Sequence, residues 1–169
     1  MKKRQEAPSW RHLRPSDLPA LVRLADEMHP DARERAEVFE EKLDLFPDGC
    51  FAFEGGGGLL GYAISHPWVD NDIPSLDAFL DQLPDAPDCL FLHDVAIAAE
   101  RRGRGATATL IEQLTDIAKR ERLPSLALVS MYGTEPLWRR RGFDCFRSDA
   151  LSVQLAKYGA AAVYMKKII

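Results

Sequence analysis

The stretch that decides the fold is Leu92–Leu114, LHDVAIAAERRGRGATATLIEQL, in which an apolar strand leads through an arginine- and glycine-rich loop into a helix. Gly103 and Gly105 carry no side chain, so main-chain N–H groups of the loop can approach a ligand closely. The helix directs its positive dipole end at the same place, and the three arginines of the loop add positive charge. The stretch therefore predicts a site for a pyrophosphate group beside the end of a strand.

Two other interpretations of this loop stay open. The spacing Gly103-x-Gly105-x-x-Ala108 also fits the dinucleotide-binding fingerprint, which is a weak signal by itself. That fold requires an acidic residue at the tip of the next strand, but the next strand ends at Val129-Ser130, and the remaining chain is too short for a second mononucleotide-binding half. A plain strand–helix turn is the other interpretation, although clustered positive charge would contribute nothing to it.

At these residues the sequence resembles the GCN5-related N-acetyltransferases (GNAT). The run Arg102–Thr107, RGRGAT, is similar to the family's Arg/Gln-x-x-Gly-x-Gly/Ala signature, with threonine at its last position. It follows Val95–Ile97, where the family has its apolar fourth strand. Pro136–Phe143 resembles the family's Phe/Leu-Tyr-x-x-x-Gly-Phe segment, with Trp138 in place of the tyrosine. The resemblance is specific from about Leu90 to Phe146, and the order of the elements extends it more loosely to the whole chain.

The resemblance implies one GNAT-like domain over residues 1–169, of the α/β (α+β) class. Its sheet is expected to be mixed but mostly antiparallel, with six to seven strands, splayed central strands and about four flanking helices. The implied function is direct transfer of the acetyl group from acetyl-CoA to a primary amine of a small cationic molecule, without a metal. The residues implied to bind the cofactor are Val95, Ala96, Ile97, Arg102, Gly103, Arg104, Gly105, Ala106, Thr107 and Trp138.

The proton acceptor is expected on the fourth strand. The run Leu92-His93-x-x-Ala96-Ile97 is similar to the arylalkylamine branch of the family, in which a histidine at this place helps to remove the proton of the amine. His93 is therefore the first candidate, since histidine titrates near neutral pH, and Asp94 is the second. Side chains alternate along a strand, so at most one of the two is expected to reach the substrate. A hydrogen-bonded structural role for either residue stays open.

The remaining steps are assigned from residue chemistry. The indole N–H of Trp138 is a donor but no useful acid, so Tyr132, at the mouth of the strand Ser125–Ser130, is expected to protonate the departing sulfur. A purely structural, amphipathic role for Tyr132 stays open. The backbone N–H of Val95 is expected to stabilise the oxyanion of the attacked thioester.

The composition of the chain limits the class of protein, its partners and its location. The chain has 169 residues, of which 46% are apolar and 28% charged, and this describes an ordinary soluble globular domain. The net charge of −4 and the pI near 5.6 argue against general nucleic-acid binding. Three cysteines, Cys50, Cys89 and Cys145, show no metal-ligand spacing, and their odd number argues against a disulfide framework. No apolar run approaches a membrane span, and no signal-peptide core follows Met1–Arg4, so a cytoplasmic location is expected. If the protein is oligomeric, a homodimer is the usual assembly.

Hydrophobic periodicity predicts the other elements. A short helical turn is expected after Ser75 within the proline- and aspartate-rich segment Pro67–Pro87. The six aspartates between Asp70 and Asp88 either attract a cationic amine or belong to a solvated loop, and the arginines at 139–141 either approach the cofactor phosphates or face solvent. Strands are expected at 10–14, 50–54, 59–66, 90–98, 125–130, 143–146 and 161–168, helices at 16–28, 32–46, 105–122 and 134–141, and a hairpin turn at 55–58.

Two other functions stay open. One is a regulatory acyl-CoA-binding module without turnover, which the missing tyrosine leaves available. The other is an acetyltransferase that acts on a protein N-terminus or on lysine, and it would need an open peptide groove. A segment Pro67–Pro87 folded over the site would favour a small amine instead.

Overall fold

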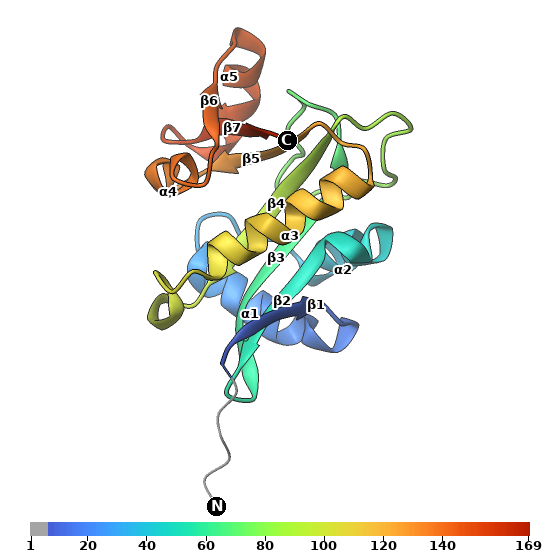
Figure 1. The fold of residues 1–169 in the computed structure, drawn as a ribbon. Helices are drawn as coiled ribbons and strands as arrows, with labels where there is room; N and C mark the ends of the chain where they lie inside the picture. Colours follow the sequence, from blue (N-terminus) through green and yellow to red (C-terminus); the bar gives the residue numbers. More distant parts are fainter. Residues whose placement is uncertain (1–6) are drawn as a thin grey trace, which may run out of the picture.

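Residues 7–169 are described by a computed structural model, in which seven strands form one sheet in the order β1-β2-β3-β4-β5-β7-β6 (Figure 1). All neighbouring strands are antiparallel except β4 and β5, which are parallel. This mixed, mostly antiparallel sheet confirms the predicted fold class. The strands are β1 Ser9–His12, β2 Cys50–Gly55, β3 Gly58–Trp68, β4 Cys89–Ile97, β5 Ser125–Ser130, β6 Asp144–Phe146 and β7 Val163–Ile168.

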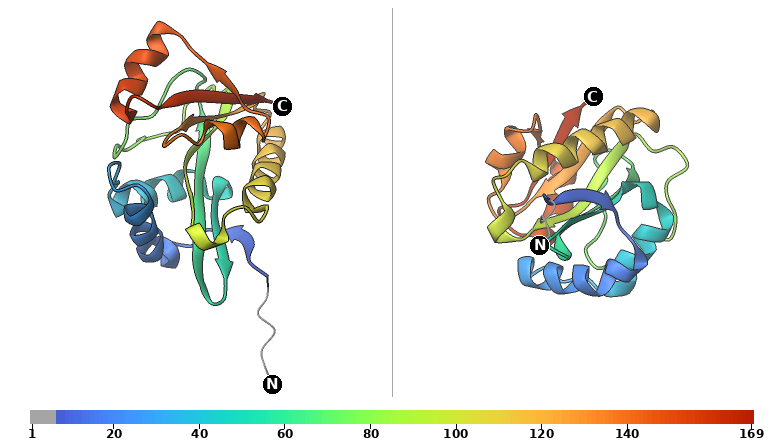
Figure 2. Two further views of the ribbon diagram at one scale, coloured as in Figure 1. Left: turned by 90° about the vertical axis from the view of Figure 1, so that its left-hand side faces the viewer. Right: turned by 60° about the horizontal axis from the view of Figure 1, so that its bottom comes forward.

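Helices cover both faces of the sheet, as the two further views show (Figure 2). The α-helices are α1 Leu18–Met28, α2 Ala36–Leu45, α3 Ala106–Arg120, α4 Glu135–Arg139 and α5 Asp149–Leu155, with 3₁₀ turns at Pro15–Asp17, Pro47–Gly49, Ala99–Arg101 and Ala156–Tyr158. None of the helices within residues 7–169 combines the length and the apolar character needed to cross a membrane. The segment Met1–Arg4 lies outside the described residues.

Apolar stripes of the helices form the two layers of core. On one face of the sheet, α3 buries the side chains that its 3.6-residue period predicted: Leu110, Ile111, Leu114, Ile117 and Ala118. On the other face, α1 and α2 bury Leu21, Ala25, Phe39 and Leu43 against β2 and β3. The core therefore lies in two layers, one on each face of the sheet.

A two-residue turn joins β2 to β3. Gly56 and Gly57 have φ of +63° and +84°, the left-handed values that a type I′ hairpin turn requires of both central residues. The predicted glycine hairpin is therefore confirmed.

The sheet splays where β4 leaves β5. Strand β4 pairs with β5 only from Leu90 to Leu92, and its last five residues have no partner on that side within the described pairing. On its other side Ile64 of β3 pairs with Asp94 but Ser65 pairs with Leu92, so His93 is the extra residue of a β-bulge. Because a bulge bends its strand and re-aims side chains, it turns the end of β4 away from β5.

Two local predictions were wrong, and one helix was not predicted. The segment after Ser75 forms no helical turn, because its backbone N–H groups bond to neighbouring side chains: both carboxylate oxygens of Glu41 on α2 accept from Leu80 and Asp81. Helix α2 begins at Ala36 rather than near residue 32. Helix α5 was missed; it is only seven residues long and buries Leu151 alone, so it leaves almost no apolar periodicity in the sequence.

Candidate functional site

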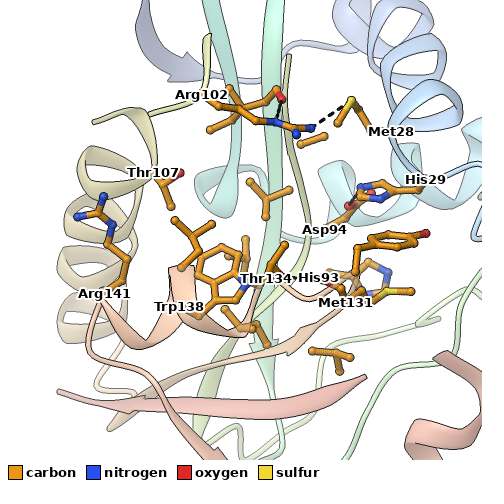
Figure 3. A pocket seen from close by; sticks show the side chains of 18 of the residues that line it. Met28, His29, His93, Asp94, Arg102, Thr107, Met131, Thr134, Trp138 and Arg141 are labelled. Carbon is orange, nitrogen blue, oxygen red and sulfur yellow. Dashed lines mark hydrogen bonds and ion pairs between the residues drawn. The ribbon is translucent and has the colours of Figure 1, made fainter. Parts of the chain in front are cut away.

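A cavity of about 650 Å³ opens in the gap between β4 and β5 (Figure 3). At one end it is lined by the arginine–glycine loop, the start of α3 and residues of α4. At the other end it is lined by His29, Glu34, His93, Asp94, Tyr132 and Tyr158. The cavity therefore joins a cationic end to an end that holds imidazoles and carboxylates.

The start of α3 forms the floor of the cationic end. Gly103 and Gly105 have φ of +72° and +82°, and a Cβ built on either would meet no atom within 4 Å, so the backbone of the loop is accessible. No side chain caps α3, which leaves the N–H groups of its first turn without intrahelical partners. Trp10 holds this turn in place, since its indole N–H donates to the Ala106 carbonyl at 2.8 Å. An uncapped helix start of this kind is suited to a phosphate.

The positive charge comes from two segments of the chain. Arg101 and Arg102 of the loop line the cavity together with Arg140 and Arg141, which follow α4. The Nε atoms of Arg101 and Arg141 are buried without a hydrogen-bond partner, so each has a donor available for an anion. Residues 139–141 were expected either to approach the cofactor phosphates or to face solvent. Only Arg140 and Arg141 line the cavity.

Two other arginines do not line the cavity. Arg104 was predicted to bind the cofactor, but its side chain is exposed and is not among the lining residues. It lies between two glycines of left-handed φ, a geometry that turns the loop and sends this side chain to solvent. Arg139 forms an ion pair with Glu135 at 2.8 Å on the surface of α4.

The free edge of β4 forms the wall between the two ends. The N–H of Ala98 donates to the Leu60 carbonyl of the neighbouring β3 segment at 2.8 Å. Because backbone groups alternate in direction along a strand, Val95 and Ile97 direct theirs to the opposite side, into the cavity. The Ile97 carbonyl there accepts from Nε of Arg102 at 3.0 Å. The wall thus offers strand-type hydrogen bonding to an extended ligand.

His93 lies at the far end with its side chain 1% exposed. Its Nε2 is 3.4 Å from Oε2 of Glu34, and its Nδ1 is buried without a partner. Burial alone would raise the pKa of Glu34, but the His93 imidazole, the charge of Lys42 and the Asp77 amide lower that pKa further than burial raises it. The carboxylate is therefore ionised at neutral pH.

Asp94 forms a second imidazole–carboxylate pair. Its Oδ2 accepts from the Tyr62 hydroxyl at 2.7 Å, and its Oδ1 lies 3.1 Å from Nε2 of His29. Burial is the largest single influence on the pKa of His29 and lowers it, but Asp94, the Val95 backbone and Glu34 together raise it, and the net shift is upward.

The expectation that the side chains of His93 and Asp94 lie on opposite faces of the strand was wrong. Both side chains line the cavity, because the bulge at His93 interrupts the alternation of the strand. Sequence reasoning missed Glu34 and His29, which precede β4 by some 60 residues and belong to no motif. The only signal in the sequence was their position, since His29 directly follows α1 and Glu34 lies in the segment after it.

Tyr132 and Trp138 occupy different surroundings. Tyr132 lines the cavity half-exposed, and its ring stacks on His29 with centroids 5.8 Å apart. Burial, Asp31 and Asp94 raise its pKa, so the phenol stays protonated at neutral pH. Trp138 is buried against Phe143, and its N–H donates to the Thr134 hydroxyl at 3.2 Å. Only the phenol therefore has a proton available to a ligand.

The segment between β3 and β4 contributes to the lining of the imidazole end. The Tyr158 hydroxyl donates to the Pro74 carbonyl, which connects the turn after α5 to this segment, and Leu76 lines the cavity beside it. Asp70 pairs with Lys166 at 2.7 Å, and none of the six aspartates between residues 70 and 88 lines the cavity. Within residues 7–169 no group of three or more His, Cys, Asp or Glu side chains is placed to hold a metal ion.

Comparisons with known proteins agree with this geometry. The model of the acetyltransferase (GNAT) family matches residues 11–143, while no curated protein matches the sequence. Solved structures similar to this chain include ribosomal-protein-alanine N-acetyltransferase of Brucella melitensis, with 22% identity, TM-score 0.65 and coverage of 95% of this chain and 99% of that one.

Two further structures have bound CoA compounds. Naa50 of Arabidopsis thaliana, in complex with a bisubstrate analogue CoA-Ac-MVNAL, has 12% identity, TM-score 0.70 and coverage of 96% and 99% of the two chains. A GNAT-like decarboxylase, GphF, in complex with isobutyryl-CoA, has 19% identity, TM-score 0.70 and coverage of 95% and 98%. At these identities the likeness shows a shared fold.

Proposed function

The chain belongs to the acetyltransferase (GNAT) family, and on that premise we propose that it transfers the acetyl group of acetyl-CoA directly to the primary amine of a small cationic molecule. One observation carries the proposal: a single cavity joins an uncapped, arginine-lined helix start to two imidazole–carboxylate pairs, along a free strand edge.

Acetyl-CoA supplies an activated thioester. The N–H groups at Gly103–Thr107 and the buried Nε donors of Arg101 and Arg141 would hold its pyrophosphate. Val95 and Ile97 would pair with the pantetheine arm, the latter after Arg102 releases its carbonyl. Trp138 contributes an apolar wall, since its N–H is already bonded.

His93 would prepare the acceptor. A protonated amine has no lone pair, so the imidazole must first take a proton, directly or through a water molecule. The neutral nitrogen then attacks the carbonyl carbon and a C–N bond forms. As the C–S bond breaks, the nitrogen loses its second proton to solvent, which leaves a neutral amide. The N–H of Val95 faces the cavity and would donate to the oxyanion, a contribution of roughly 3 kcal/mol for a preorganised donor. Tyr132, or solvent, would protonate the departing sulfur.

Direct transfer is supported by the cysteines. No cysteine is among the residues that line the cavity, and burial raises the pKa of both Cys50 and Cys89 to about 12. A thiol with such a pKa is a poor nucleophile at neutral pH. An acetyl-enzyme intermediate therefore has no suitable carrier in this site.

A small acceptor is supported by the closed imidazole end. Tyr158 and Leu76 cover it, and the segment between β3 and β4 is fixed to both sides of the molecule, to α2 through Glu41 and to α5 through Gln154. An extended peptide would have to displace these contacts. The cationic character of the acceptor is supported by Glu34 and Asp94, and not by the aspartates of the loop.

The test is thiol release from acetyl-CoA over a panel of polyamines, arylalkylamines, aminoglycosides, amino acids and short peptides. Turnover with a small amine, lowered about 100-fold or more but still measurable in His93→Gln, is the expected result. Turnover with peptides alone would overturn the small-acceptor assignment. Tight acetyl-CoA binding without turnover on any amine would instead favour the regulatory module.

A further inference from the structure

Glu34 has an arrangement that the transfer chemistry above does not use. It lies in the segment between α1 and α2, it is buried, and its Oε2 contacts two groups at once. That oxygen accepts from the backbone N–H of Asp77 at 3.0 Å and lies 3.4 Å from Nε2 of His93. One carboxylate oxygen thus connects the segment over the site to the imidazole inside it.

Hydrogen-bond accounting fixes the imidazole proton. An ionised carboxylate only accepts hydrogen bonds, so a neutral imidazole facing it must carry its proton on the nearer nitrogen, Nε2. The other nitrogen, Nδ1, is then a lone pair, and it is the His93 atom that is buried without a partner. With the side chain 1% exposed, bulk water does not satisfy this atom.

We propose that Glu34 is a positioning residue that holds His93 as the Nε2–H tautomer, so that Nδ1 is the lone pair left to take the proton of the acceptor amine. This rests on the proposed function of His93. When Nδ1 accepts the proton, the ring becomes a cation beside the Glu34 carboxylate, which stabilises it without itself being protonated.

The groups around His93 support a shared role. His66 on β3 lies with its ring centroid 5.6 Å from that of His93, and burial followed by the neighbouring His93 lowers its pKa to about 3, so it stays neutral. Asp94 is the adjacent residue, and Lys42 on α2 is buried under the same segment, where its Nζ donates to the Ala78 carbonyl at 3.2 Å. The single negative charge in hydrogen-bond contact with the His93 ring, among the described residues, is that of Glu34.

The first test is independent of turnover. The ring ¹⁵N shifts of His93, assigned by their loss in His93→Gln, report which nitrogen carries the proton. The expected result is the Nε2–H tautomer in the unaltered protein at a pH where the ring is neutral, and loss of that preference in Glu34→Gln. An Nδ1–H tautomer in the unaltered protein would overturn the proposal whether or not the protein is an acetyltransferase.

The second test is kinetic. Glu34→Gln is expected to lower kcat about 10- to 100-fold, within what a positioned base contributes. Asp77→Asn is the matched control: it makes the same carboxylate-to-amide change and removes the ion pair with Arg35, but it keeps the N–H that donates to Glu34. It should leave the Nε2–H tautomer of His93 in place.

The double variant decides between positioning and mere stability. If Glu34 acts through His93, then Glu34→Gln in a His93→Gln background lowers the residual kcat by less than 2-fold. An equal loss in both backgrounds, or an unchanged Nε2–H tautomer in Glu34→Gln, would refute the positioning role.

Discussion

Replacing Gly105 by alanine separates the role of this residue in the fold from its role at the anion site. Gly105 precedes α3 with φ of +82°, and Gly57, in the turn between β2 and β3, has a nearly identical φ of +84°. A Cβ added to either glycine meets no atom within 4 Å. The two Gly→Ala variants therefore differ in location but not in local backbone geometry or crowding.

Both substitutions lower the stability of the fold for the same physical reason. Left-handed backbone costs an L residue about 1–2 kcal/mol, and the reduced entropy of the unfolded chain returns about 0.4–1 kcal/mol. Both Gly105→Ala and Gly57→Ala are thus expected to lose about 1 kcal/mol of unfolding free energy, measured by urea denaturation. Equal losses would show that the helix start itself tolerates the methyl group.

Only Gly105→Ala places a methyl group where a phosphate would approach the N–H groups of α3. We expect its Kd for CoA, measured by isothermal titration calorimetry, to rise at least 10-fold, or about 1.4 kcal/mol, while Gly57→Ala stays within about 2-fold of the unaltered protein. Equal CoA affinity of the two variants would refute the assignment of this loop to the pyrophosphate. If Gly105→Ala lost much more unfolding free energy than Gly57→Ala, weaker CoA binding would be explained by damage to the start of α3 instead.

Three further predictions concern single groups. Trp138→Phe loses the hydrogen bond to Thr134 and should cost about 1 kcal/mol in urea denaturation while kcat changes by less than about 2-fold, since the indole has no free proton to give. Tyr132→Phe should lower kcat about 10-fold or more with an unchanged KM for acetyl-CoA, and a normal kcat would remove this phenol from the reaction. The hydrogen bond from Arg11 holds the pKa of Asp17 below its usual value of 3.8, so this carboxylate stabilises the fold above that pH and the stabilisation is lost as pH falls through the lowered pKa. Urea denaturation at pH 6 and pH 3 should therefore show a smaller loss on acidification in Arg11→Met than in the unaltered protein.

The arrangement of α3 and the strands beside it could be predicted because their signals are local. The apolar face of α3 follows a 3.6-residue period, and the glycines before it and in the β2–β3 turn occupy backbone conformations that glycine adopts freely. The segment after Ser75 gave a false helix signal, since its backbone partners are side chains of α2 that lie far away in the sequence.

The imidazole end shows the opposite case. His93 and Asp94 were identified as candidates, but sequence alternation placed them on opposite faces, and only pairing with β3 reveals the bulge that brings both into the cavity. Glu34 and His29 had no motif to mark them. Arg104 belongs to the loop motif, yet the turn of the backbone directs it to solvent.

The sequence alone thus determined the strand–loop–helix unit that would hold the pyrophosphate, because its spacing, glycines and charge act within some 20 residues of chain. Only the tertiary structure decided which groups line the imidazole end of the cavity. Glu34 reaches His93, and His29 reaches Asp94, because α1 and the segment after it pack across the bulged end of β4. Contacts between distant segments depend on how the layers pack, and a pattern of residues that are close in the sequence does not specify that packing.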